Sequence, residues 1–169
     1  ESIVGHDDPG VITGKPLDQG GSEGRGFSTA QGGVYCVTEL AKKMNWKAEE
    51  TTVAVQGYGN AGSYMAKILK ELGYKIVAVS DSKGGVFAKD GIDPNKIDEV
   101  KEGESNLACY CSDGTCKIAE DAPSEGACHS ITNEEILELD VDILVPAALE
   151  NVITKENANN VKAKAVVEL

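Results

Sequence analysis

The apolar residues follow two different spacings along the chain, and each spacing predicts one kind of element. Spacings of three and four residues in 28–45 and in 61–72 are typical of amphipathic helices. Short β-branched or continuously apolar runs predict buried strands at 52–56, 75–80 and 141–145, with a further strand at 165–168. Because strands and helices alternate, the pattern predicts an α/β fold on a doubly wound, mostly parallel sheet with helices on both faces.

Weaker signals fill the stretches between these elements. Residues 5–26 are rich in Gly, Pro and Asp and predict a loop, while 82–93 predict turns, with a small hairpin as one interpretation. A helix is expected at 94–101. Thr132 and Glu135 have the spacing of a capping box, in which each side chain bonds the other residue's backbone N–H, so a short helix is expected there.

Residues 104–130 form a polar, aperiodic excursion that is longer than compact α/β domains usually need. It carries four of the five cysteines, which are Cys109, Cys111, Cys116 and Cys128. Four thiolates are enough for a tetrahedral zinc site, but their spacing is not that of the common zinc modules. We favour free thiols in an inserted loop that is peripheral to cofactor binding, and we expect the fifth cysteine, Cys36, to be a small core residue.

The charge balance narrows the classes of partner. With 16 basic and 28 acidic residues the net charge is −12, which argues against nucleic acid because phosphate binding needs a basic surface. No apolar run approaches the roughly 20 residues of a membrane span and no signal-peptide pattern opens the chain, so a membrane is not expected as a partner either. Since no disulfide framework spans the sequence, a cytoplasmic, reduced protein is the simplest interpretation.

The length of 169 residues suits a single domain over 1–169. The sequence begins at Glu1 rather than at Met and stops at Leu169 within a strand-like run. We therefore expect a piece of a longer polypeptide.

A glycine-rich turn supplies the motif on which the functional prediction rests. The segment matches the pattern G-x-G-x-x-G and reads Gly57-Tyr58-Gly59-Asn60-Ala61-Gly62. With a strand before it, a helix after it and a second strand following, it is typical of a dinucleotide-binding, Rossmann-type unit. The first glycine permits the tight turn, the second lets the backbone approach a pyrophosphate, and the third lets the helix pack on the strand. The pyrophosphate would bind free N–H groups at the positive end of the helix.

An acidic residue stands where such a unit holds the cofactor ribose. Asp81 lies 19 residues after Gly62, at the expected end of the second strand. A carboxylate there accepts a hydrogen bond from the ribose 2′-hydroxyl of NAD and repels the 2′-phosphate of NADP, so NAD is the expected cofactor. The competing interpretation is a turn-forming Asp before Ser82, and the neighbouring Lys83 leaves NADP possible.

Small residues end the third strand, at the carboxyl edge where such sheets bind ligands. Ala147 and Ala148 follow Pro146 and leave room for a ring or a ribose. A strand terminator with small packing residues explains them equally well.

Four segments resemble glutamate dehydrogenases: TGKPLDQGGSEGRGFSTAQG at 13–32, VAVQGYGNAG at 53–62, VSDSKGG at 79–85 and LVPAALENVITKENA at 144–158. The resemblance covers most of the chain outside the cysteine-bearing excursion, and its first motif is long and specific. It points to the C-terminal dinucleotide-binding domain of the glutamate, leucine, phenylalanine and valine dehydrogenases. It implies the reversible NAD(P)-dependent oxidative deamination of L-glutamate to 2-oxoglutarate and ammonia, in a homo-oligomer that the resemblance makes a hexamer.

The resemblance also assigns residues and leaves alternatives. Thr29 would lie near the nicotinamide and the substrate, and Arg25 would shape the same cleft. From the residues alone, Ser28 or Thr29 is as well explained as the N-cap of the first helix, and Arg25 as a surface residue. A sister enzyme acting on leucine, phenylalanine or valine and a non-catalytic NAD-sensing module remain alternatives. The candidate cofactor-binding residues are Arg25, Thr29, Gly57, Tyr58, Gly59, Asn60, Ala61, Gly62, Asp81, Ser82, Ala147 and Ala148.

No catalytic residue is expected within this sequence. The catalytic lysine and aspartate of the family belong to a separate substrate domain, and its glycine-rich lysine motif has no match here. The isolated chain is therefore expected to bind the cofactor without turning over substrate.

Overall fold

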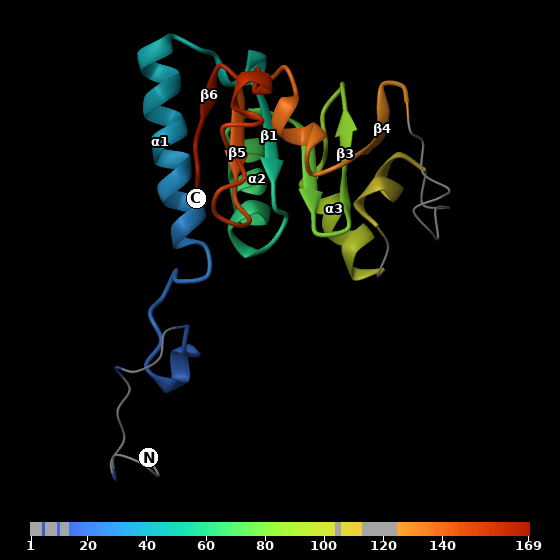
Figure 1. Ribbon diagram of the computed structural model, residues 1–169. Coiled ribbons are helices and arrows are strands. Elements are labelled where there is room, and N and C mark those ends of the chain that lie inside the picture. Colours follow the sequence, from blue (N-terminus) through green and yellow to red (C-terminus); the bar gives the residue numbers. More distant parts are fainter. Residues whose placement is uncertain (1–4, 6–9, 11–13, 104–105, 113–124) are drawn as a thin grey trace.

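The computed structural model describes residues 5, 10, 14–103, 106–112 and 125–169. The described strands form one six-stranded sheet in the order β4-β3-β2-β1-β5-β6 (Figure 1). The strands are β1 Thr52–Gln56, β2 Lys75–Asp81, β3 Gly84–Ala88, β4 Cys128–Ile131, β5 Ile143–Pro146 and β6 Ala165–Val166. The four strands predicted from the apolar runs thus correspond to β1, β2, β5 and β6.

The sheet is parallel at its centre and antiparallel on one side. β1 pairs in parallel with β2 and β5, and β5 pairs in parallel with β6. β3 runs antiparallel to β2 and to β4, so 82–88 form the turn and the second strand of a hairpin with β2, and not a separate small hairpin within 82–93. The carboxyl ends of β1, β2 and β5 therefore meet at one edge, which confirms the expected α/β architecture.

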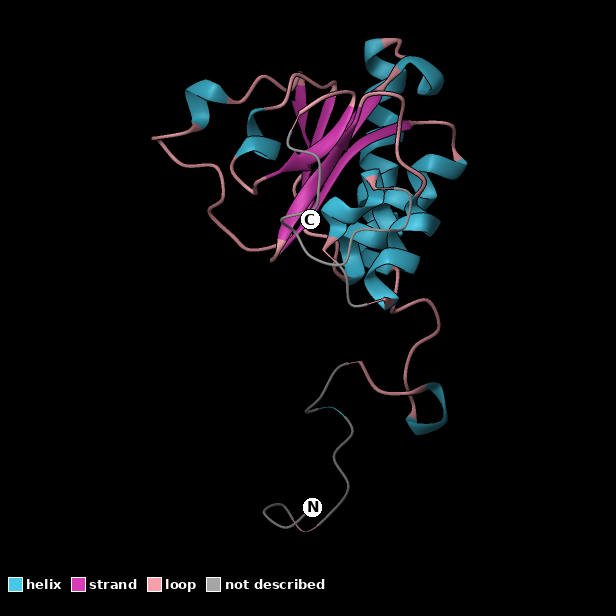
Figure 2. Ribbon diagram, turned by 90° about the vertical axis from the view of Figure 1, so that its right-hand side faces the viewer, coloured by secondary structure: helices cyan, strands magenta, loops and turns pink. Residues whose placement is uncertain are grey.

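The α-helices of the described residues cover one face of the sheet (Figure 2). They are α1 Ser28–Met44, α2 Asn60–Glu71 and α3 Pro94–Glu102. Their apolar sides form one core with the sheet, in which Val37, Met65 and Ile97 are fully buried. The spacing of three and four residues between apolar positions correctly predicted the buried sides of α1 and α2.

Short 3₁₀ helices and irregular chain cover the other face. Ile136 and Leu137 of the turn η6 (Glu135–Glu138) pack in a second core with Ala54 and Leu144. The capping box is confirmed. Thr132 N–H donates to Glu135 Oε2 at 2.7 Å, and Glu135 N–H donates to Thr132 Oγ1 at 3.1 Å. The remaining 3₁₀ turns are η2 Leu17–Gln19, η3 Ala48–Glu50, η4 Leu107–Cys111 and η7 Ala158–Asn160.

The start of α1 corrects one expectation. The helix begins at Ser28 and its N-cap position is Phe27, with no side chain capping it. The Ser28 hydroxyl donates instead to the carbonyl of Arg25 at 3.2 Å. Neither Ser28 nor Thr29 is therefore the N-cap, and the exposed Thr29 side chain is free of that structural role.

The described parts of the cysteine-bearing excursion, 106–112 and 125–130, pack into the fold. Leu107 of η4 is fully buried in the first core, and the Tyr110 hydroxyl accepts from the Asp93 N–H at 3.0 Å. The end of the excursion forms β4, which pairs with β3. These parts complete the core at the antiparallel side of the sheet, and the expectation that the excursion is peripheral to cofactor binding stays a prediction.

The interpretation as free thiols is wrong for three cysteines, and with it the expectation of a reduced protein. Cys111 and Cys128 form a disulfide between η4 and β4, and Cys109 is disulfide-bonded as well. Thiols held in disulfides are not available as zinc ligands, and no group of three metal-ligating side chains occurs among the described residues. Cys116 lies outside those residues. Cys36 is free, but it is exposed rather than part of the core.

Within the described ranges no helix has the length and apolar character needed to cross a membrane.

Candidate cofactor-binding site

The glycine turn begins where β1 ends, and its first glycine is required by both conformation and space. Gly57 has φ of 94°, a left-handed value that other residues rarely adopt. A Cβ atom on Gly57 would lie 2.7 Å from the carbonyl oxygen of Ala147 and 2.8 Å from Cβ of Ala148. The structure therefore brings the glycine turn and the two small residues after β5 together, as the sequence suggested.

The other two glycines differ from each other in an informative way. A Cβ on Gly62 would lie 1.9 Å from the carbonyl oxygen of Gly57, so only glycine lets α2 pack this closely on the turn. A Cβ on Gly59 would meet no atom within 4 Å. Gly59 is exposed, and no contact within the described structure requires a residue without a side chain at this position. An open backbone at this place fits the approach of an external pyrophosphate.

The first turn of α2 adds hydrogen-bond donors beside Gly59. The helix starts at Asn60, and no side chain caps its N-terminus. The first N–H groups of a helix have no acceptor within it, and they form its positive end. The Asn60 side chain is used elsewhere, since its Nδ2 donates to the carbonyl of Gly26 at 2.7 Å. The donors of this first turn are therefore the backbone N–H groups of Asn60 and Ala61 rather than the amide nitrogen of Asn60.

Tyr58 is a structural member of the turn rather than a side-chain ligand. Its ring is 1% exposed, and its hydroxyl donates to the carbonyl of Pro94 at 2.9 Å. Burial, followed by the nearby carboxylates of Asp98 and Asp93, raises the pKa of Tyr58 well above its usual value. The Tyr58 N–H is also engaged, because it donates to Ser80 O at 2.6 Å. The residue thus fixes the turn against α3 and β2.

Asp81 lies at the end of β2, as predicted, and both of its oxygens face identifiable groups. Its Oδ1 accepts from the backbone N–H of Lys83 at 2.9 Å, so the turn-forming interpretation is confirmed. Its Oδ2 lies 3.9 Å from Nζ of Lys101 on α3. Ser82 is exposed in the same turn.

Two residues of this region carried no signal in the sequence. Asn133 joins the ends of the strands, because its Oδ1 accepts from the Ser80 hydroxyl and its Nδ2 donates to Asp81 O, both at 2.7 Å. Lys101 Nζ donates to the carbonyl of Tyr58 at 2.6 Å. In sequence, Asn133 is one polar residue in a capping box and Lys101 resembles any solvated helix residue, so neither spacing nor composition could reveal them.

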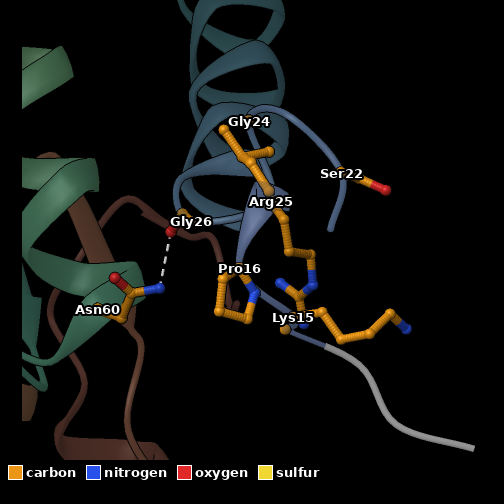
Figure 3. Close-up of a pocket in the computed structure, with 9 residues that line it drawn as sticks. Lys15, Pro16, Ser22, Gly24, Arg25, Gly26 and Asn60 are labelled. Atoms are coloured by element: carbon orange, nitrogen blue, oxygen red, sulfur yellow. Dashed lines mark hydrogen bonds between the residues drawn. The ribbon is translucent and has the colours of Figure 1, made fainter. Parts of the chain in front are cut away.

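An open pocket of about 510 Å³ lies between the glycine-rich N-terminal segment and α2. Lys15, Arg25, Gly26 and Asn60 are among its lining residues. Figure 3 shows the Asn60 amide directed at Gly26, while the side chains of Arg25 and Lys15 extend away from Asn60. The structure therefore places Arg25 near the start of α2 and leaves Thr29 exposed in the first turn of α1.

Parallel strands that end at a glycine turn, an uncapped helix and a carboxylate define a Rossmann-type domain. The chain belongs to the Glutamate/Leucine/Phenylalanine/Valine dehydrogenase family, whose profile matches residues 20–169.

Individual relatives agree with this assignment. The chain is 44% identical over 162 residues to an NADP-specific glutamate dehydrogenase of Synechocystis, covering 95% of this chain and 36% of the relative. It is 44% identical over 160 residues to a cryptic catabolic NAD-specific glutamate dehydrogenase of Bacillus subtilis, covering 95% of this chain and 34% of the relative. The hetero-hexameric glutamate dehydrogenase of Thermus thermophilus superposes with a TM-score of 0.72 at 32% identity, covering 95% of this chain and 34% of that one. The chain thus spans about a third of the length of these relatives.

Proposed function

We propose that this chain is the NAD(P)-binding domain of a glutamate dehydrogenase. The observation that carries the proposal is the contrast between the glycines of the turn. Gly57 and Gly62 are forced by internal contacts, whereas Gly59 is open to solvent beside the uncapped start of α2. A glycine without an internal reason is explained by a ligand whose phosphates approach the backbone there.

The described residues supply a place for each part of the cofactor. The backbone from Gly59 to Ala61 would hold the pyrophosphate, and Asp81 with Ser82 would hold the adenosine ribose. Ala147 and Ala148 would leave room for the nicotinamide half, with Arg25 and Thr29 toward the substrate. When bound, NAD or NADP supplies the hydride acceptor, and the part of this chain is to bind and orient it.

The reaction we propose for the whole enzyme is the reversible oxidative deamination of L-glutamate to 2-oxoglutarate and ammonia. The names of the relatives at 44% identity support glutamate as the substrate, and nothing found favours leucine, phenylalanine or valine, or a purely NAD-sensing role. We propose further that the enzyme is a homo-oligomer, specifically a hexamer. We also propose that it is located in the cytoplasm. The catalytic lysine and aspartate would come from outside residues 1–169, so this chain alone would not turn over glutamate.

A titration of NADH fluorescence tests the proposal. We expect a saturable change, and we expect Gly59→Val to weaken it at least about tenfold, or roughly 1.4 kcal/mol, because the branched side chain fills the space of the pyrophosphate. Circular dichroism of the variant should match that of the parent. The absence of any saturable change into the millimolar range would contradict the proposal. Glutamate-dependent NADH formation by the chain alone would contradict the assignment of catalysis to residues outside it.

A further inference from the structure

A single asparagine ties the end of β2 to the segment that leads into η6. Asn133 Nδ2 donates to the backbone carbonyl of Asp81 at 2.7 Å, and Asn133 Oδ1 accepts from the Ser80 hydroxyl at 2.7 Å. One planar amide can make both bonds at once, because it carries donors on one atom and an acceptor on the other. Asn133 thus holds two consecutive residues of β2 from sequence separations of 53 and 52.

The first of these residues, Ser80, also holds the glycine turn. Its backbone carbonyl accepts from the N–H of Gly57 at 2.9 Å and from the N–H of Tyr58 at 2.6 Å. Ser80 is fully buried, and Asn133 satisfies its hydroxyl. The end of β2 and the start of the glycine turn are therefore one hydrogen-bonded unit, and Asn133 belongs to it.

The second residue, Asp81, is fixed at two places. Asn133 holds its backbone carbonyl, and the N–H of Lys83 donates to its carboxylate Oδ1 at 2.9 Å. The Asp81 side chain is only 18% exposed. Oδ2 is then the oxygen left for a ribose hydroxyl, and its direction follows from the two fixed points. Because a hydrogen bond weakens steeply when its angle is poor, that direction decides the strength of a ribose contact.

Asn133 lies beside the proposed ribose position without being spent on a ligand. It lines an open pocket of about 510 Å³ together with Ser82 and Lys83. Its side-chain nitrogen and oxygen both make bonds within the protein. A side chain engaged in this way acts on a ligand through the group that it holds, as an outer layer of hydrogen bonds does around a preorganised site.

We propose that Asn133 is a positioning residue for cofactor binding, which orients Asp81 so that its carboxylate selects a ribose that carries a 2′-hydroxyl. The inference rests on the proposed function, since Asp81 is the proposed ribose acceptor. It goes beyond that function by making the ribose selectivity depend on a residue from the segment between β4 and β5.

The test uses 5′-AMP and 2′-deoxy-5′-AMP as competitors in a fluorescence titration of NADH. These two nucleotides differ only in the hydroxyl group that Asp81 would accept from. The ratio of their inhibition constants therefore reports this one hydrogen bond. A general loss of stability or of affinity changes both constants alike and leaves the ratio where it was, so a merely structural role would not move it.

Two variants remove the positioning bond in different ways. Asn133→Ala removes both side-chain bonds. Asn133→Asp keeps the size of the side chain and an acceptor for the Ser80 hydroxyl, but it loses the donor to the carbonyl of Asp81. This second variant keeps the test open if the alanine variant folds poorly, and circular dichroism shows whether each variant is folded.

Asn157→Ala is the matched control. The Asn157 side chain also bridges two backbone groups, because it accepts from the Thr154 N–H at 2.7 Å and donates to the carbonyl of Val152 at 2.8 Å. These groups follow β5 and lie outside the unit formed by β2 and the glycine turn. The control therefore loses the same kind of contact at a place that does not orient Asp81.

We expect the parent to bind 5′-AMP roughly tenfold to a hundredfold more tightly than 2′-deoxy-5′-AMP, the usual worth of a hydrogen bond to a charged acceptor. Both Asn133 variants should reduce this ratio to about threefold or less, since the carboxylate is no longer held in place. Asn157→Ala should keep the ratio of the parent.

A double-mutant cycle with Asp81→Ala tests whether Asn133 acts through Asp81. In the Asp81→Ala background, adding Asn133→Ala should change the affinity for 5′-AMP by less than about twofold, because the group that Asn133 positions is gone. Independent losses that add in the double variant would overturn the inference, since Asn133 would then act on the ligand by another route.

The remaining failures are distinguishable. If the parent binds the two nucleotides equally, Asp81 is not the ribose acceptor, and that part of the proposed function fails. If the parent distinguishes them and both Asn133 variants keep its ratio, the inference is overturned while the proposed function stands.

Discussion

Thr52 and Asp142 exchange three hydrogen bonds where β1 begins and β5 is about to begin. The N–H and the hydroxyl of Thr52 donate to Asp142 Oδ2 at 2.7 and 2.8 Å, and the Asp142 N–H donates to the Thr52 hydroxyl at 3.0 Å. Asp142 Oδ1 accepts from Lys164 Nζ at 2.6 Å. These hydrogen bonds connect the start of β1 to the start of β5, at the end of the sheet opposite to the glycine turn.

The ionisation of Asp142 makes this contact dependent on pH. Burial tends to raise the pKa of the carboxyl group, but the hydrogen bonds from Lys164 and Thr52 outweigh burial and lower it. A lowered pKa means stability that is fully present above the unfolded-state pKa of about 3.9 and is lost as the pH falls through the folded-state value.

Asp142→Asn should therefore lower the free energy of unfolding by roughly 2 kcal/mol at pH 7, because it removes hydrogen bonds to a charged acceptor. The difference from the parent should shrink below about pH 4, where the parent also loses the charge. Urea unfolding at pH 7 and at pH 3.5 measures both values. The exposed Asp140, as Asp140→Asn, is the control and should change stability by less than about 0.5 kcal/mol. A difference that persists in full at pH 3.5 would refute the electrostatic explanation.

Gly59→Ala and Gly62→Ala should separate binding from folding. The added methyl group of Gly62→Ala meets the Gly57 carbonyl, so we expect a loss of about 1–3 kcal/mol in unfolding free energy. The methyl group of Gly59→Ala meets nothing, so stability should stay within about 0.5 kcal/mol while NADH affinity falls. Thermal melts and NADH titrations of both variants give the comparison. A normal NADH affinity in Gly59→Ala would remove the main support for a pyrophosphate at this turn.

Asp81→Ala should shift the cofactor preference from NADH toward NADPH. Losing a charged acceptor should weaken NADH binding by roughly tenfold to a hundredfold, whereas NADPH gains from the lost repulsion. The ratio of the two dissociation constants, measured by fluorescence, is the readout. A ratio equal to that of the parent would show that Asp81 only forms its turn with Lys83.

The disulfide between Cys111 and Cys128 should contribute to stability and not to binding. The double variant Cys111→Ala, Cys128→Ala removes a bond between residues separated by 17 positions in the sequence. Because this bond restricts the unfolded chain, its loss should lower the free energy of unfolding by about 3 kcal/mol. NADH affinity should remain nearly unchanged, since the bond lies between η4 and β4. Cys36→Ala, at the exposed free cysteine, is the control. A large loss of NADH affinity in the double variant would show that this side of the sheet supports the cofactor site.

The sequence predicted those elements whose reasons are local. Apolar spacing locates α1 and the buried strands, and the glycine pattern locates the turn, because each depends on residues close together in the chain. The end of β2 at Asp81 follows from the same reasoning. The capping box at Thr132 was found in the same way, although the helix it opens is only a 3₁₀ turn.

The features that the sequence did not reveal depend on contacts between distant segments. Lys101 meets Asp81 only because α3 packs beside α2, and the burial of Leu107 depends on the sheet that it covers. Cys111 likewise bonds Cys128 because the pairing of β3 with β4 brings Cys128 close to η4. Aperiodic sequence suggested a loop at 104–130, but in the described parts, 106–112 and 125–130, tertiary contacts determine the structure that local propensity does not.

The reversed direction of β3 has a consequence for the order in which the site is assembled. β2 and β3 are joined by a short turn at Ser82 and Lys83, so their pairing is local, whereas β1 meets the region of β5 across a separation of 90 residues. A ribosome delivers the N-terminal segments first. The strands and turns around Gly59 and Asp81 can therefore pair in the nascent chain before Ala147 and Ala148 have been synthesised. The part of the site that we propose for the adenosine half of the cofactor would therefore form before the part that we propose for the nicotinamide half.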